Sequence, residues 1–245
     1  VLYHVFLFSS RYPLLSEVCC SSLLFSSTTV IMTLTVEIPQ TKEDFYRMGE
    51  IRSQAFGSEQ FFIDILFPNH HTAAGRLLLR DRLLKIREMP SARFAMVRDT
   101  ETGEIISQAE WHYYPKDSVG DIMDLSFVEG SEEEKAFATH ILGTFQRKRR
   151  EAIANTKVPL MLLDSLTTDP KYQKRGAGSM LVKWGLNIAD SMNGEAYLEA
   201  SEYGKPVYEK YGFVALESYK VPVPPHWGRK PDIEYTLMRR PVADK

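Results

Sequence analysis

The first part of the chain changes period several times, and each period predicts a different element. Leu34, Val36 and Ile38 alternate with polar residues, which predicts a half-buried strand over residues 33–38. Residues 41–52 and 72–88 have apolar positions every three or four residues, the period of an amphipathic helix. Residues 93–97 and 104–113 return to the strand pattern, with a polar, glycine-containing hairpin loop between them.

Local signals mark the ends of these helices. Thr41 and Asp44 have the spacing of a capping box, with Asp in place of Glu. A short helix is predicted over residues 59–67, and Pro90 ends the longer helix that follows. We expect the buried stripe of that longer helix to include Leu77, Leu78 and Leu84.

The second part of the chain predicts another alternation of helices and strands. A helix over residues 133–150 would bury Phe137, Ile141 and Phe145 and end in the basic run 147–150, which we interpret as a solvated helix end that complements the helix dipole. The remaining elements are an apolar strand ending near Thr168, a helix with Met180, Leu181, Trp184 and Ile188 as its stripe, and further strands over residues 196–201, 213–221 and 233–238. A short helix separates the first two of these strands. The pattern predicts an α/β protein with a mixed sheet flanked by helices.

One strand-to-helix connection carries the clearest chemical signal. After the strand come Lys174, Arg175, Gly176 and Gly178, and then the helix begins. A helix start presents free N–H groups and the positive end of the dipole, and glycines let a phosphate approach the backbone. The loop therefore predicts an anion site. A Walker loop would place Lys after the glycines, and a dinucleotide fingerprint would have three glycines, so both of these alternatives are incomplete.

Two motifs in order resemble a known family. The run Gln173-Lys174-Arg175-Gly176-Ala177-Gly178 resembles the Gln/Arg-x-x-Gly-x-Gly/Ala pyrophosphate loop of the GNAT superfamily of acyl-CoA-dependent N-acetyltransferases. Downstream, Tyr208-Glu209-Lys210-Tyr211-Gly212-Phe213 is similar to the family's Tyr-x-x-x-Gly-Phe ending. The resemblance is specific over residues 158–221. It implies the GNAT fold, with a mixed, mostly antiparallel sheet of about seven strands flanked by helices, over residues 32–245 with a helical insertion at about 115–155.

The resemblance also implies where the coenzyme binds. The backbone at the end of the central strand would pair with the pantetheine arm, and the glycine loop would hold the pyrophosphate. The implied acetyl-CoA-binding residues are Leu166, Thr167, Thr168, Gln173, Lys174, Arg175, Gly176, Ala177, Gly178, Ser179 and Ser201.

The sequence indicates a candidate general acid but leaves several candidates for the general base. Tyr208 takes the family's general-acid position, and a phenol is protonated at pH 7. On the strand 104–113, Gln108, Glu110 and His112 share one face, so Glu110, or else His112, is a candidate base unless that face is merely solvated. Asp164 interrupts an apolar strand and is either a base or a structural carboxylate. By resemblance, the first helix and the loop after it form one wall of the acceptor site; there Phe61, Phe62 and Phe67 are candidate substrate contacts or core residues.

The expected function is transfer of the acetyl group of acetyl-CoA to a primary amine by direct attack, without a covalent enzyme intermediate. A non-catalytic acyl-CoA-binding module remains the alternative. The acceptor, a small-molecule or peptide amine, and the oligomeric state cannot be read from the sequence. No metal is expected.

Composition constrains the setting. The 245 residues have a formal net charge of -2, which gives no sign of a nucleic-acid partner, and they contain no apolar run of membrane-spanning length. The two cysteines are adjacent, Cys19 and Cys20, so we expect no disulfide framework and a cytoplasmic protein. Residues 1–31 are nearly uncharged and precede Met32; we expect them to be a disordered or non-native extension and exclude them from the fold.

Overall fold

A single seven-stranded sheet organises the structure, a computed structural model that describes residues 34–56, 64, 66–67, 69–118, 120, 131–223, 225 and 233–243. The chain divides into two units, residues 1–31 and 32–245, and every described residue belongs to the second. The strands lie in the order β1-β2-β3-β4-β5-β7-β6, and only β4 and β5 run parallel. Their bounds are β1 Leu34–Glu37, β2 Ala92–Asp99, β3 Ile105–Tyr114, β4 Leu160–Thr168, β5 Glu195–Ala200, β6 Val214–Val221 and β7 Ile233–Arg240. The predicted fold class, a mixed and mostly antiparallel sheet of seven strands, is confirmed.

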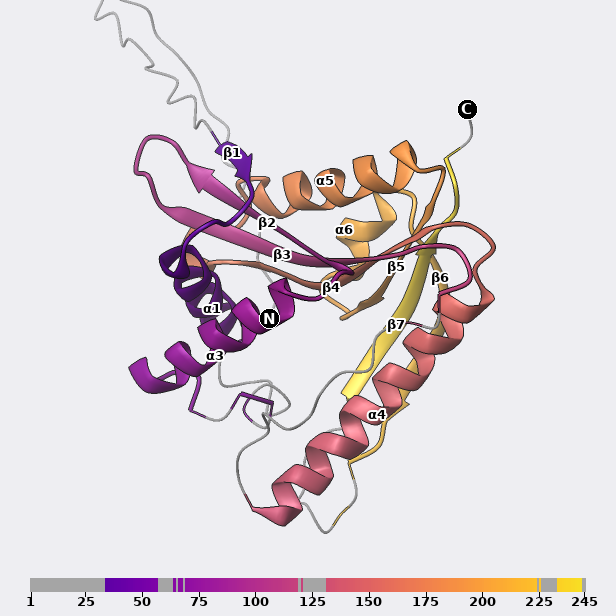
Figure 1. Ribbon diagram of the computed structural model, residues 1–245, viewed down its shortest axis with the longest axis horizontal. Helices are drawn as coiled ribbons and strands as arrows, with labels where there is room; N and C mark the ends of the chain where they lie inside the picture. The colour runs from indigo at the N-terminus through magenta and orange to yellow at the C-terminus, as the bar shows by residue number, and fades with distance from the viewer. Residues whose placement is uncertain are drawn as a thin grey trace, which may run out of the picture. The chain divides into compact units, whose positions relative to one another are not determined.

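Helices cover both faces of this sheet (Figure 1). Helices α5 and α6 lie on one side, and α1, α3 and α4 lie on the other. Their bounds are α1 Lys42–Phe56, α3 Ala73–Arg87, α4 Glu132–Asn155, α5 Ala177–Ser191 and α6 Lys205–Glu209, with a 3-10 turn at Pro170–Tyr172. Among the described residues no helix combines the length and apolar character of a membrane span.

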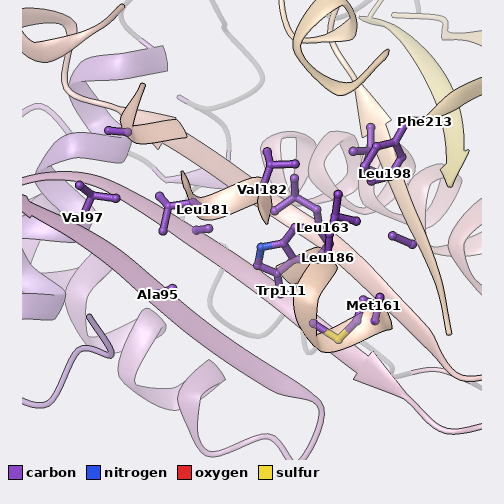
Figure 2. Packing of buried hydrophobic residues seen from close by; sticks show 14 of the residues in the cluster. Ala95, Val97, Trp111, Met161, Leu163, Leu181, Val182, Leu186, Leu198 and Phe213 are labelled. Atoms are coloured by element: carbon purple, nitrogen blue, oxygen red, sulfur yellow. The ribbon is translucent and has the colours of Figure 1, made fainter. Parts of the chain in front are cut away.

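The main core lies between α5 and the sheet (Figure 2). Trp111 of β3 is fully buried among Leu163, Leu186 and other apolar side chains of this cluster. Gly185 of α5 lies directly over the indole: a Cβ at this position would be 2.2 Å from the Cε2 atom of Trp111. Because residue 185 is a glycine and has no Cβ, α5 can pack closely against β3 at Trp111.

The opposite face of the sheet has two groups of helices. Phe45 and Met48 of α1 pack with Leu79 and Leu83 of α3 and with Phe94 of β2. Helix α4 packs further along the sheet through two clusters, one around Ile153 and one around Phe137 and Ile141. The capping box that begins α1 is confirmed, since the Thr41 and Asp44 side chains each accept a hydrogen bond from the other residue's backbone N–H.

The predicted stripe of α3 is wrong at Leu77 and Leu78, whereas Leu84 packs against the cluster of α1 and α3. Leu77 and Leu78 are 42% and 53% exposed, whereas Leu79 and Leu83 are buried. Both sets fit a helical period, and three consecutive leucines leave the phase of the stripe undecided. Gly75 settles it: a Cβ there would lie 2.0 Å from the carbonyl oxygen of Asn69, so this edge of α3 faces the preceding turn.

The interpretation of residues 147–150 as a solvated helix end is wrong for the helix end and for Arg149, although Arg147 and Arg150 are exposed. Helix α4 continues to Asn155, so the basic run lies inside the helix and not at its negative end. Arg149 points into the protein, where it binds two carboxylates described below. Phe137 and Ile141 are buried as predicted, and the side chain of Phe145 is not among those that the structure describes.

The region after α1 is only partly within the described residues. The short helix predicted over 59–67 falls mostly outside them, as do the candidate substrate contacts Phe61 and Phe62. Phe67 packs at the edge of the α1–α3 cluster, with the Arg82 guanidinium 4.7 Å from its ring centre. This contact fits the core alternative for Phe67.

Candidate active site

The central feature of the site is a divergence of two neighbouring strands. β4 pairs with β5 only from Leu160 to Leu163, opposite residues 195–198. β4 then continues to Thr168, paired on its other side with β3, while β5 continues to Ala200, paired with β7. Among the described residues, the β5-facing backbone edge of residues 164–168 therefore has no strand partner. An extended chain could add to the sheet along this edge.

The glycine loop adjoins this open edge. α5 begins at Ala177 with no side-chain cap, so its first N–H groups are available for an anion. Gly176 has a φ of 88°, a left-handed conformation that suits glycine, and the space where its Cβ would lie is open. A Cβ on Gly178 would lie 3.6 Å from the Thr168 Oγ1 atom and 3.9 Å from the Leu166 Cδ2 atom. Strand end and helix start therefore meet.

The two basic residues of the loop have different environments. The Arg175 guanidinium donates to the Asp99 carboxylate at 2.6 Å and lies 5.2 Å from the Tyr172 ring centre. The hydrogen bond from Arg175 is the main reason why the pKa of Asp99 is lowered. Lys174 is exposed and has no carboxylate partner among the described residues. Of the two charges expected to compensate a phosphate, Lys174 is the one not already paired.

Ser201 and Tyr208 lie together at the end of β5. The Ser201 Oγ accepts from the Gly204 N–H at 3.2 Å, and a Cβ on Gly204 would lie 3.0 Å from the Tyr208 Cε2 atom. The Tyr208 ring packs against the main core and edge-on to Phe213, with 5.9 Å between ring centres. Burial raises the pKa of Tyr208 to about 12, so its hydroxyl is a neutral donor at pH 7.

On the opposite face of the sheet, the polar side chains of β3 form a buried network. Glu110 accepts from Arg52 of α1 at 2.8 Å and bonds His112 at 3.1 Å, and His112 bonds the Ser91 hydroxyl at 2.9 Å. Gln108 donates to the Thr167 hydroxyl of β4 at 2.7 Å. These residues do share one face, as predicted, but the face is buried and not solvated.

A second buried group stands beside the first. Arg149 of α4 binds Asp164 of β4 and, at 2.9 Å, Glu199 of β5. Asp164 is the additional residue of a β-bulge, because Glu110 pairs with Ser165 while Trp111 pairs with Leu163. The structural alternative for Asp164 therefore has a named partner. We call the six residues of both groups the charged row: Arg52, Glu110, His112, Asp164, Arg149 and Glu199.

The three carboxyl groups of the charged row differ in pKa: those of Asp164 and Glu110 are lowered, and that of Glu199 is raised. Burial would raise the pKa of Asp164, but Arg149 and His112 lower it to about 2. Burial and Asp164 would raise the pKa of Glu110, and Arg52 with His112 outweighs them, so this pKa is lowered. For Glu199 burial outweighs the attraction of Arg149, and the pKa is raised. Glu199 is thus the carboxyl group of the row with the strongest affinity for a proton.

The pKa of His112 is raised as well. Burial would lower it, but the hydrogen bond to Glu110 and the charge of that carboxylate outweigh the loss of solvation. A protonated His112 is therefore stabilised beside Glu110.

The fold thus gathers the predicted residues into two sets. The strand end, the loop, Ser201 and Tyr208 lie on the α5 side or at the open edge, whereas Glu110 lies on the other face. The divergence of β4 and β5 lies between them. Sequence reasoning missed Glu199 and the inward role of Arg149. A signal existed for both: Glu199 interrupts an apolar strand, and Arg149 continues the four-residue spacing of Phe137 and Ile141.

Comparison with known proteins agrees with this geometry. Residues 132–221 match the acetyltransferase (GNAT) domain family. The match covers residues 132–221, which include β4, the glycine loop, α5 and Tyr208, and the sheet order is that of the GNAT fold. Among curated proteins, the probable acyltransferase SID5 of Ajellomyces capsulatus is 34% identical over 55 residues, which are 22% of this chain and 40% of that protein. The match thus spans less than half of that relative's length.

Solved structures share the fold over most of the chain. One is a histone acetyltransferase HPA2 and related acetyltransferase from Corynebacterium glutamicum, with 23% identity, a TM-score of 0.54, and coverage of 87% of this chain and 99% of that one. Another is mosquito arylalkylamine N-acetyltransferase like 5b, with 11% identity, a TM-score of 0.58, and coverage of 85% and 99%. At these identities the likeness concerns the fold.

Proposed function

We propose that the chain transfers the acetyl group of acetyl-CoA to a primary amine by direct attack. The observation that carries this proposal is the open backbone edge of residues 164–168, which ends at the uncapped start of α5. An extended amide-containing arm can pair with such an edge, and a pyrophosphate suits such a helix start. Acetyl-CoA has both parts joined in this order.

In the proposed site, different residues bind different parts of acetyl-CoA. The backbone of Leu166, Thr167 and Thr168 pairs with the pantetheine arm. The loop from Gln173 to Ser179 holds the pyrophosphate through backbone N–H groups, and Lys174 supplies a charge. Ser201 lies near the arm. The full set is Leu166, Thr167, Thr168, Gln173, Lys174, Arg175, Gly176, Ala177, Gly178, Ser179 and Ser201.

The reaction breaks the thioester C–S bond and forms a C–N bond. The neutral amine attacks the carbonyl carbon and then loses a proton, and the departing sulfur gains one. Tyr208 is the proposed donor to sulfur, because its raised pKa keeps the hydroxyl protonated. Glu110 is the proposed acceptor of the amine proton, through His112 or a water molecule.

The surroundings of Glu110 favour a second base for testing. Arg52 and His112 engage both of its carboxylate oxygens and lower its pKa, which weakens it as a base. Glu199 has a raised pKa and lies on the strand across the divergence. The same observation keeps the non-catalytic acyl-CoA-binding module as the second candidate function.

The proposed acceptor class is an amine without further definition. Names of similar structures include a histone acetyltransferase, an arylalkylamine N-acetyltransferase and an agmatine N-acetyltransferase, and they share only an amine to be acetylated. We propose a small-molecule or peptide amine as the partner and the cytoplasm as the location. Neither a nucleic acid nor a membrane is part of the proposal.

The first experiment is calorimetric titration of acetyl-CoA into the purified chain. Gly176→Glu should abolish binding, because it places a carboxylate at the phosphate position. Gly103→Glu is the matched control, since Gly103 also has a positive φ, 75°, and open space around it. Equal binding by wild type and Gly176→Glu, or no binding by wild type, contradicts the coenzyme assignment.

The second experiment separates enzyme from binding module. CoA release is measured with a panel of primary amines for wild type, Tyr208→Phe, Glu110→Gln and Glu199→Gln. Turnover by wild type that Tyr208→Phe lacks, with acetyl-CoA binding retained, supports the transferase. Binding without turnover on any amine supports the module.

A further inference from the structure

Three side chains of the segment between α1 and α3 converge. Asp64, His70 and His71 each place a possible ligand atom within 4.8 Å of those of the other two. No metal was expected from the sequence. Folding, and not spacing, brings these atoms together.

The hydrogen bonds of His70 determine which of its ring nitrogens carries the proton. The Ser53 hydroxyl lies 3.0 Å from the His70 carbonyl oxygen, to which it donates, and 2.7 Å from the His70 Nδ1 atom. A hydroxyl has one proton, and a carbonyl oxygen can only accept. Both contacts are satisfied when the Nδ1–H group donates to Ser53, which leaves the Nε2 atom of a neutral ring without a proton.

This arrangement leaves two acceptors facing each other. The bare His70 Nε2 atom lies 3.0 Å from the Asp64 Oδ1 atom. Two lone pairs at this distance repel, so a positive charge belongs there: either a second proton on His70 or a metal cation bound by both atoms. A second proton would satisfy Asp64 and His70 alone. A metal ion also accounts for His71, which places a ring nitrogen within 4.8 Å of both atoms.

We propose that Asp64, His70 and His71 bind a divalent transition-metal ion, with zinc as the best fit. Zinc takes imidazole nitrogen and carboxylate oxygen at about 2.0–2.2 Å, so two of its ligand atoms lie about 3 to 3.5 Å apart. The 3.0 Å between Nε2 and Oδ1 meets this requirement. Metal-bound histidines are usually oriented by a hydrogen bond from the ring nitrogen that does not bind the metal, and the Ser53 hydroxyl accepts such a bond from the His70 Nδ1–H group.

The backbone around the histidines is built to hold this position. Asn69 has a φ of 58°, and the Thr72 N–H donates to its carbonyl oxygen at 2.8 Å. Gly75 has no Cβ, which leaves room for this turn against the first turn of α3. The Arg76 guanidinium donates to the His71 carbonyl oxygen at 2.7 Å. The ion would join the end of α1, through Ser53 and His70, to the start of α3.

The test is a zinc titration of the full chain carrying Cys19→Ser and Cys20→Ser, which removes competing thiolates. The protein is freed of metal by a chelator, and zinc uptake is measured by competition with a coloured indicator. We expect one zinc ion per chain. Replacement of a ligand, by His71→Ala or by Asp64→Asn, should weaken binding at least about 10-fold, and Ser53→Ala should weaken it about 10- to 100-fold. His140→Ala, which changes an exposed histidine of α4, should bind as the parent does.

Further measurements distinguish the loss of a metal ligand from misfolding of a variant. Circular dichroism of each variant must match the parent, and His71 is exposed, so its removal leaves the core intact. Cobalt substitution should give visible d–d bands that His71→Ala lacks. The proposal is overturned if the parent binds no zinc, or if His71→Ala and Asp64→Asn bind zinc as tightly as the parent does. It is also overturned by an imidazolium signal of His70 in ¹⁵N NMR that persists with excess zinc, since the proton alone then explains the contact.

Discussion

Arg52 of α1 and Glu110 of β3 form an ion pair of 2.8 Å whose side chains are only 5% and 3% exposed. The pair joins a helix to the strand that it covers, on the face opposite α5. It also fixes the state of the proposed base, because a carboxylate held by a guanidinium resists protonation. Glu110 is therefore both a structural partner and a candidate for chemistry, and mutations must separate these roles.

Removal of Glu110 should cost stability. Glu110→Ala leaves the Arg52 charge buried without its partner, and we expect a loss of about 3–5 kcal/mol in the free energy of unfolding. Urea denaturation checks this value. The double variant Arg52→Ala/Glu110→Ala should lose less than the sum of the single variants, because each single variant strands a charge. Additive losses would mean that the two side chains are not coupled. A stable double variant without activity would place Glu110 in the chemistry.

Tyr208 should affect turnover and not coenzyme binding. If it protonates the leaving sulfur, Tyr208→Phe should lower kcat about 10²- to 10⁴-fold, the usual contribution of a general acid. The pKa of about 12 predicts a particular pH profile: wild-type kcat should show no alkaline decline from this residue below about pH 10. Steady-state kinetics over pH 6–10 tests both points. Unchanged kcat in Tyr208→Phe, with normal folding, would remove the residue from the mechanism.

The sequence predicted the elements of the sheet better than it predicted the faces of the helices. Alternation and turn signals located the strands within a few residues, because these signals are local. The stripe of α3 was misplaced because three consecutive leucines satisfy more than one phase. The phase is decided by the turn at Asn69 packing on Gly75, which is a tertiary contact.

The two halves of the site differed in the same way. The glycine loop and the position of Tyr208 could be found because their chemistry is local and their motif is contiguous. The charged row could not, since it combines residues from five elements. The solvated interpretation of Arg149 failed because its partners, Asp164 and Glu199, are distant in sequence. A basic run looks solvated when only its neighbours are known.

Asp164 should make stability depend on pH in the acidic range. Its pKa is lowered from 3.8 to about 2 on folding, so the stabilisation is fully present above about pH 4 and is lost as the pH falls toward 2. The two values correspond to about 2 kcal/mol. The stability difference between wild type and Asp164→Asn should therefore shrink by about this amount from pH 5 to pH 2. Chemical denaturation at both pH values measures it, with Asp117→Asn, at an exposed position, as the control. A difference that does not change with pH would show that the Asp164 charge adds no stability.

Gly185 should be intolerant of even one added carbon. Gly185→Ala would place a Cβ 2.2 Å from the Trp111 ring, and the indole is fully buried among the side chains of the main core. Overpacking of this kind costs about 1–3 kcal/mol and occasionally more, which should outweigh the better helix propensity of alanine. Gly143→Ala in α4 is the matched control, because nothing lies within 4 Å of its Cβ position and the residue is exposed. That change should stabilise the protein by up to about 1 kcal/mol. Thermal and urea denaturation of the two variants should therefore shift in opposite directions, and a shift in the same direction would mean that α5 does not pack on Trp111 as closely as the structure has it.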